Sequence, residues 1–140
     1  MSARNGQCLC GGVRFTAAPV KQEMGVCHCS MCRRWSGGVF MAVECEAVAV
    51  ADDRHLGIYK SSEYGERCFC TTCGSTLFWR MQSGEGHVAV SLQAFEDPGQ
   101  FAFTSEIFVD EQPSNYAFAN KTKRITGEQF IAAFTASTGE

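Results

Sequence analysis

Short runs in which apolar and polar residues alternate dominate the chain up to about residue 110. In Leu77-Phe78-Trp79-Arg80 and in His87-Val88-Ala89-Val90, one face would be apolar and the other partly polar, as in a half-buried β-strand. Turns rich in Gly, Asp, Ser or Cys separate these runs. The pattern predicts strands at Val13–Thr16, Val39–Val43, Ala47–Val50, Leu56–Lys60, Glu63–Phe69, Thr76–Arg80, His87–Leu92 and Glu106–Val109.

A helical pattern occurs only near the C-terminus, where apolar residues recur at helical spacing between Phe130 and Phe134. Just before them, Thr126 and Gln129 have the spacing of a capping box, in which each residue's side chain accepts from the other's amide. These residues predict one short helix over Gly127–Thr135. The predicted fold class is mainly β, with small antiparallel sheets and this helix packed on a sheet.

Length and composition indicate one domain over residues 1–140, because no repeat, linker or change in composition divides the chain. No stretch approaches the roughly 20 apolar residues that a membrane span needs. Residues 1–7 lack the apolar region of a signal peptide, so we expect a cytoplasmic protein. The net charge of −3 gives no general attraction to phosphate backbones. Neither a membrane nor a nucleic acid is expected as a partner.

The nine cysteines change this picture most. Cytosolic thiols are kept reduced, so disulfides are not expected there. The cysteines cluster as C-x-C and C-x-x-C, which in a reducing compartment is typical of metal sites. A redox C-x-x-C is the alternative, but its usual βαβ context is missing. Buried cysteines without a ligand are a further alternative.

Two separate pairs add up to a closed four-sulfur site: Cys8 with Cys10, and Cys70 with Cys73. In a C-x-x-C-G turn, both sulfurs can point at one zinc ion about 2.3 Å away, and the glycine permits the tight backbone. Such a site would tie the N-terminal strand to the central hairpin. The free energy of zinc binding at this site would then mostly stabilise the folded state.

A third cluster, Cys27, Cys29 and Cys32, supplies three sulfurs and leaves one position of a tetrahedral zinc ion open, as in catalytic sites. Three thiolates leave the ion a poor Lewis acid for water but suit a fourth sulfur ligand. A substrate thiol bound there would be held as thiolate, the nucleophilic form. The chain is therefore expected to bind two Zn²⁺ ions, one for folding and one for chemistry.

The neighbours of this trio have weaker signals. Arg33 and Arg34 can offset its negative charge or hold a substrate carboxylate, or they are a solvated basic pair. His28 is expected not to be a ligand, because its ring would compete with two adjacent sulfurs. Cys45 and Cys68 are expected to behave as small apolar residues, although Cys68 forms a C-x-C with Cys70 that can compete for metal.

Three motifs follow one another over roughly residues 8–80: Cys8-Leu9-Cys10-Gly11-Gly12-Val13-Arg14-Phe15, the segment from Cys27 to Gly38, and Arg67-Cys68-Phe69-Cys70-Thr71-Thr72-Cys73-Gly74-Ser75-Thr76-Leu77. Their order resembles the glutathione-dependent formaldehyde-activating (GFA) family. The C-terminal third departs from the family pattern, which often has a His-Ile-aromatic stretch followed by Pro and then Trp. This chain has Glu106-Ile107-Phe108 and Pro113-Ser114-Asn115-Tyr116 instead.

The resemblance implies a β-tent fold of small antiparallel sheets around zinc. It implies a structural ion at Cys8, Cys10, Cys70 and Cys73, and a catalytic ion at the Cys27–Cys32 trio. The implied chemistry adds the sulfur of glutathione to formaldehyde, giving S-hydroxymethylglutathione, or reverses that addition. Glutathione or another small thiol would be the substrate.

The sequence thus predicts a zinc-dependent carbon–sulfur lyase that acts on a small thiol–aldehyde adduct. A non-enzymatic zinc module that contacts protein or nucleic acid is the alternative, and a fourth ligand from His28 or Cys45 would favour it. A metal-storage or redox-sensing protein is a third reading. Exposed edge strands favour a homodimer.

Overall fold

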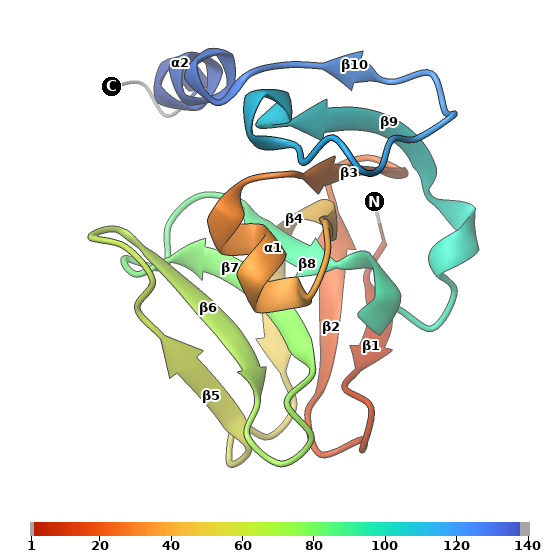
Figure 1. Cartoon of the computed structure of the whole chain (residues 1–140). Coiled ribbons are helices and arrows are strands. Elements are labelled where there is room, and N and C mark those ends of the chain that lie inside the picture. Colours follow the sequence, from red (N-terminus) through yellow and green to blue (C-terminus); the bar gives the residue numbers. More distant parts are fainter. Residues whose placement is uncertain (1, 138–140) are drawn as a thin grey trace.

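The longest strand, β4 (Phe40–Val50), connects the two halves of the sheet in the computed structural model, which describes residues 2–137 (Figure 1). One edge of β4 pairs with β3 (Glu23–Cys27) and β2 (Arg14–Pro19), and the other pairs with β8 (Val88–Ser91). The sequence predicted two strands in this stretch. They form one strand because no turn-forming residue interrupts the apolar and polar alternation between them.

The strands join into one hydrogen-bonded sheet in the order β10-β9-β3-β4-β8-β7-β6-β5, with β1 beside β2. The predicted mainly β class is confirmed. The sheets are not separate, however, and β9 pairs in parallel with β3 and with β10, because the chain makes long crossovers between them. The remaining strands are β1 (Arg4–Gln7), β5 (Leu56–Tyr59), β6 (Gly65–Cys70), β7 (Thr76–Met81), β9 (Ala102–Ile107) and β10 (Lys123–Arg124).

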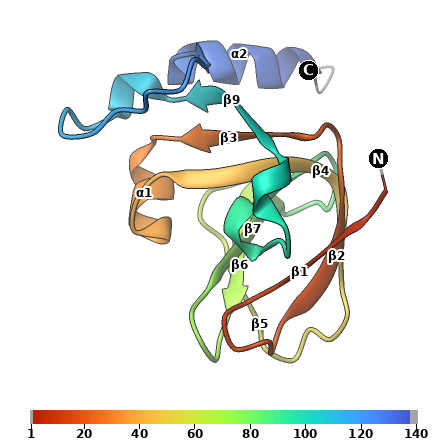
Figure 2. The ribbon, with the colours of Figure 1, turned by 90° about the vertical axis from the view of Figure 1, so that its right-hand side faces the viewer.

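The core lies where the sheet curls so that β2 faces β7 (Figure 2). Phe15 from β2 meets Phe78 edge-on at 6.4 Å and Phe95 at 5.9 Å between ring centroids. Cys45 and Cys68 are both fully buried in this core, which confirms that they behave as small apolar residues.

The predicted capping box is confirmed at the start of α2 (Gly127–Ser137). The Gln129 amide donates to Thr126 Oγ1 at 3.2 Å, and the Thr126 amide donates to Gln129 Oε1 at 2.8 Å. The Phe130 ring lies 5.8 Å from that of Phe108, which follows β9. The predicted strand at Glu106–Val109 ends at Ile107, because Phe108 adopts a left-handed conformation with φ of 56° and a 3₁₀ turn, Val109–Glu111, follows.

One helix was not predicted: α1 (Ser30–Ser36), which lies inside the three-cysteine segment. It ends at Gly37, whose φ of 75° is left-handed and whose amide donates to Arg33 O. Among residues 2–137, neither α1 nor α2 has the length and apolar character of a membrane-crossing helix.

Gly25 is required where β3 meets β9, since an added Cβ would lie 2.3 Å from Ser105 Oγ and 3.0 Å from Ser105 O. We expect Gly25→Ala to destabilise the protein by about 1–3 kcal/mol, because the two strands must separate to accept the methyl group. Urea unfolding measures this change. Gly99→Ala is the control, because a Cβ there meets nothing within 4 Å, and an equal loss in both variants would contradict the explanation.

Candidate metal sites

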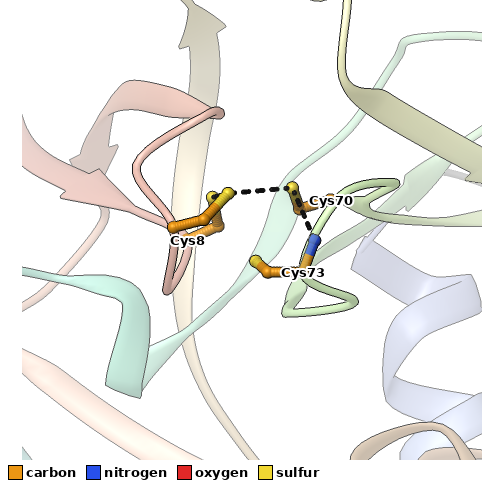
Figure 3. A group of neighbouring side chains, drawn as sticks. Cys8, Cys70 and Cys73 are labelled. Atoms are coloured by element: carbon orange, nitrogen blue, oxygen red, sulfur yellow. Dashed lines mark hydrogen bonds between the residues drawn. The ribbon is translucent and has the colours of Figure 1, made fainter.

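The four-cysteine set forms where the turn after β1 meets the turn between β6 and β7. Cys8 and Cys10 come from the first turn, Cys70 ends β6, and Cys73 lies in the second turn. Their sulfurs all lie within 4.8 Å of one another. Figure 3 shows the sulfurs of Cys8, Cys70 and Cys73 directed toward a common centre. The structure therefore brings together all four residues that the spacing predicted.

The distances in this set fit a tetrahedral zinc ion and not disulfides. Cys8 Sγ and Cys10 Sγ are 3.7 Å apart, and Cys10 Sγ and Cys70 Sγ are 3.8 Å apart. A disulfide would bring sulfurs to about 2.05 Å. Zinc–sulfur bonds of about 2.3 Å in a tetrahedron place sulfurs about 3.8 Å apart. The donor set suits zinc in both element and spacing.

Backbone amides also point at these sulfurs, which favours thiolates. Val13 N donates to Cys8 Sγ at 3.2 Å, and Cys73 N donates to Cys70 Sγ at 3.5 Å. The hydrogen bond from Ser75 is the main cause that lowers the pKa of Cys73 to about 5. Gly74, with φ of 79°, permits the turn, as the C-x-x-C-G spacing predicted.

The three-cysteine set lies at a strand end and the start of a helix. Cys27 ends β3, Cys29 is the N-cap of α1, and Cys32 lies in the first turn of α1, where its amide donates to Cys29 Sγ at 3.3 Å. The three sulfurs lie within 4.8 Å of one another. In the described part of the chain, no fourth cysteine, histidine or carboxylate joins this set. Its sulfur donors also suit zinc, with one tetrahedral position left over.

These thiols share their protons unequally. Hydrogen bonds from Cys27 and Cys32 lower the pKa of Cys29 to about 2, and the charge of Arg67 acts in the same direction. Hydrogen bonds with Cys29 and Cys32, together with burial, raise the pKa of Cys27. These contacts favour a thiolate at Cys29 over one at Cys27.

His28 lies between two of these cysteines but belongs to a different network, in which His28 and Glu106 are both fully buried. Its Nε2 lies 2.8 Å from Glu106 Oε1, and its Nδ1 lies 2.7 Å from the Tyr116 hydroxyl. The Glu106 carboxylate also accepts from Thr122 Oγ1 at 2.6 Å and from Arg124 Nη1 at 2.5 Å. Both ring nitrogens of His28 are thus engaged, which agrees with the expectation that it is not a metal ligand.

Burial raises the pKa of Glu106, but the hydrogen bonds from Thr122, His28 and Arg124 outweigh it, so the net pKa is lowered. Glu106 is therefore ionised and accepts only. It follows that His28 Nε2 donates to the Glu106 carboxylate. Glu106 and Tyr116 occupy the positions where the sequence departs from the family pattern, and that departure was the only sequence signal of this network.

The two arginines predicted to lie near the trio have different surroundings. Arg33 Nε donates to the backbone oxygen of His28 at 2.8 Å, so Arg33 fixes the segment between two cysteines. Arg34 is exposed and lines an open hollow of about 990 Å³ together with Trp35 and Phe40. Trp35 and Phe40 also pack against Cys27 and Cys32. A substrate contact by either arginine stays a prediction.

The sequence predicted no role for Arg67, whose guanidinium nevertheless contacts a cysteine of the trio. Arg67 is buried on β6, and its Nη1 donates to Cys32 Sγ at 3.6 Å. Its guanidinium also stacks on the Trp35 ring, 4.9 Å from the centroid.

A mainly β fold that gathers four cysteines at one place and three at another defines a class of small β-proteins able to hold two metal ions. A family model described as glutathione-dependent formaldehyde-activating enzyme matches residues 3–111. The chain belongs to this family, as its motifs predicted.

Individual relatives agree with this assignment. An uncharacterised lyase of Schizosaccharomyces pombe is 32% identical over 132 residues, covering 94% of this chain and 96% of the relative. A Halomonas elongata protein, provisionally named a glutathione-dependent formaldehyde-activating enzyme, is 34% identical over 83 residues, covering 52% of this chain and 53% of its own length. The family is enzymatic and the first relative is named a lyase, which confirms the predicted enzyme class.

The fold also matches a solved structure. A crystal structure of a Rhodobacter sphaeroides protein aligns with a TM-score of 0.58 at 23% identity, covering 71% of this chain and 99% of that one. At this identity the likeness shows the shared fold alone.

Proposed function

We propose that this protein is a zinc-dependent carbon–sulfur lyase that joins a small thiol to an aldehyde, or separates the two. Glutathione and formaldehyde are the first pair to test. The observation that carries the proposal is the contrast between the two cysteine sets. Four sulfurs, enough for a tetrahedral ion, gather at one place, while the other set has three and no fourth ligand among residues 2–137.

The two cysteine sets would have different roles. Cys8, Cys10, Cys70 and Cys73 would hold a structural ion. Cys27, Cys29 and Cys32 would hold the catalytic ion, whose remaining coordination position would supply a soft, exchangeable site for a substrate sulfur. Arg34, which is exposed and follows Cys32 by two positions, would contact a carboxylate of the thiol substrate.

The proposed reaction changes one carbon–sulfur bond. In the direction of addition, the thiolate sulfur attacks the carbonyl carbon and the carbonyl oxygen takes up one proton from water. In reverse, the carbon–sulfur bond breaks, its electron pair stays on sulfur, and the hydroxyl proton leaves to water as the carbonyl forms. The protein contributes most by holding the sulfur as thiolate, since only that form is nucleophilic.

A fourth ligand from His28 or Cys45 would favour the alternative of an interaction module. Both ring nitrogens of His28 are hydrogen-bonded elsewhere, and Cys45 lies in the main core with its sulfur 3.6 Å from Val43 O. These contacts favour the lyase over the module. The cytoplasmic location and the homodimer stay predictions.

The test uses metal content and thiol binding together. We expect two zinc ions per chain, one of which a mild chelator removes readily. Cys29→Ser should lose the labile ion and the binding of glutathione while keeping the tightly held ion and the fold, because a serine hydroxyl is a poor zinc ligand. Metal analysis and isothermal titration with glutathione measure both effects.

Cys45→Ala is the matched control, because it removes a buried cysteine outside both sets. It should keep two ions and full glutathione binding. Exchange spectroscopy with ¹³C-formaldehyde should show the wild type accelerating adduct formation over the spontaneous rate, with Cys29→Ser at that spontaneous rate. Equal acceleration by Cys29→Ser, or a single tightly held ion in the wild type, would overturn the proposal.

A further inference from the structure

Arg67 is a buried cation without a carboxylate partner. Its side chain is 6% exposed, and no Asp or Glu among residues 2–137 forms an ion pair with it. Its Nε is buried without any hydrogen-bond partner. Burying a charge in this way is costly unless an opposite charge compensates it.

The group available to compensate Arg67 is the three-cysteine set. Arg67 Nη1 donates to Cys32 Sγ at 3.6 Å, and its guanidinium stacks on the ring of Trp35, a residue of α1. A cation–π contact alone stabilises an arginine by a smaller amount than burial costs it. The buried charge of Arg67 would therefore be compensated by the thiolates with which the three-cysteine set holds a zinc ion.

Charge counting shows what this cation does for the site. Three thiolates on a divalent ion leave one net negative charge, and a fourth thiolate from a substrate raises that to two. The positive charge of a guanidinium beside Cys32 offsets one negative charge, both with and without the substrate thiolate. Its stabilising effect is larger in the state with the substrate thiolate, because more negative charge is present.

We propose that Arg67 is a positioning residue that balances the charge of the three-cysteine centre, so that an anionic substrate sulfur can bind as its fourth ligand. This inference rests on the proposed function. Arg67 acts through Cys32 and not on the substrate's carboxylates. Strand β6 thus carries both Cys70, a member of the four-cysteine set, and Arg67, which contacts the three-cysteine set.

The experiment uses protein loaded with Co²⁺, whose visible spectrum reports a change of ligand at the labile site. Two probes are titrated: glutathione, and 2-mercaptoethanol, which has no carboxylate. Arg67→Met removes the charge and retains an apolar stem. We expect half-saturation by both thiols to need about 10- to 100-fold more thiol than in the wild type, and a chelator to remove the labile ion faster by a similar factor.

Two further variants sharpen the result. Arg67→Lys retains the charge without the planar stack, so it should recover part of the thiol binding. Arg80→Met is the matched control, because Arg80 on β7 stacks on Phe78 and pairs with Glu66 away from both cysteine sets. It should lower stability without changing thiol binding. If Arg67→Met does not fold, Arg67→Gln replaces it as the neutral variant.

The outcomes separate the two proposals. Equal weakening for both thiols supports charge balance at sulfur. Weakening for glutathione alone would overturn it in favour of a carboxylate contact, and wild-type binding by the neutral variant would overturn it outright. If neither thiol changes the spectrum of the wild type, the proposed function itself fails.

Discussion

Replacing Cys70 with alanine is expected to remove the tightly held ion and with it the native fold. Cys70 is fully buried at the end of β6, and its sulfur lies 3.8 Å from that of Cys10, in the turn between β1 and β2. Structural zinc contributes about 10–16 kcal/mol in small zinc domains. That is as large as the entire stability of a typical domain, about 5–15 kcal/mol. Metal analysis and thermal unfolding followed by circular dichroism measure the loss.

Cys68→Ala is the matched control for this prediction. Cys68 lies two residues earlier on the same strand and is equally buried, but it belongs to neither cysteine set. Losing its sulfur leaves a small cavity, which costs about 1 kcal/mol, and both ions should remain. A Cys70→Ala protein that keeps two ions and the wild-type unfolding temperature would contradict a structural role for the four-cysteine set.

Replacing Glu106 with alanine is expected to destabilise the protein by about 3–5 kcal/mol, because it breaks a buried charged network from one side. The substitution leaves the buried His28 ring without its acceptor and Arg124 without its carboxylate. Since His28 lies between Cys27 and Cys29, the labile ion should also be lost faster to a chelator. Urea unfolding and chelator kinetics measure the two effects.

Glu44→Ala provides the comparison, because Glu44 is 65% exposed and pairs with the exposed His87. Such surface pairs contribute about 0–1 kcal/mol. Because the pKa of Glu106 is lowered in the folded protein, its carboxylate stabilises the fold at neutral pH. This stabilisation is lost as the pH falls below about 4.3, the usual pKa of glutamate. Equal stability of the two variants at neutral pH would contradict the role assigned to the Glu106 network.

The sequence was most informative where structure follows from local spacing. The two cysteine sets, the capping box at Thr126 and the strongly alternating strands could all be predicted from neighbouring residues. Helix α1 could not, because seven residues are too few for an apolar period. Its ends depend on single residues, the N-cap Cys29 and the left-handed Gly37.

Contacts between distant residues explain the remaining differences. Cys32 and Arg67 are 35 residues apart, and His28 and Glu106 are 78 apart. No periodicity links such pairs, and only the pairing of β3 with β9 brings His28 to Glu106. The sequence therefore predicted the neighbours Arg33 and Arg34 as charge partners of the trio, whereas the structure shows Arg67 in contact with Cys32.

The spread of the two cysteine sets along the chain has a consequence for biosynthesis. Cys27, Cys29 and Cys32 leave the ribosome together, whereas the other set stays incomplete until Cys73 has been made. Domains begin to organise while their C-terminal parts are still being synthesised. A nascent chain thus presents the complete three-cysteine set while the other set consists of Cys8 and Cys10 alone. If both sets bind zinc as proposed, the four-cysteine site can form only after Cys70 and Cys73 have been made.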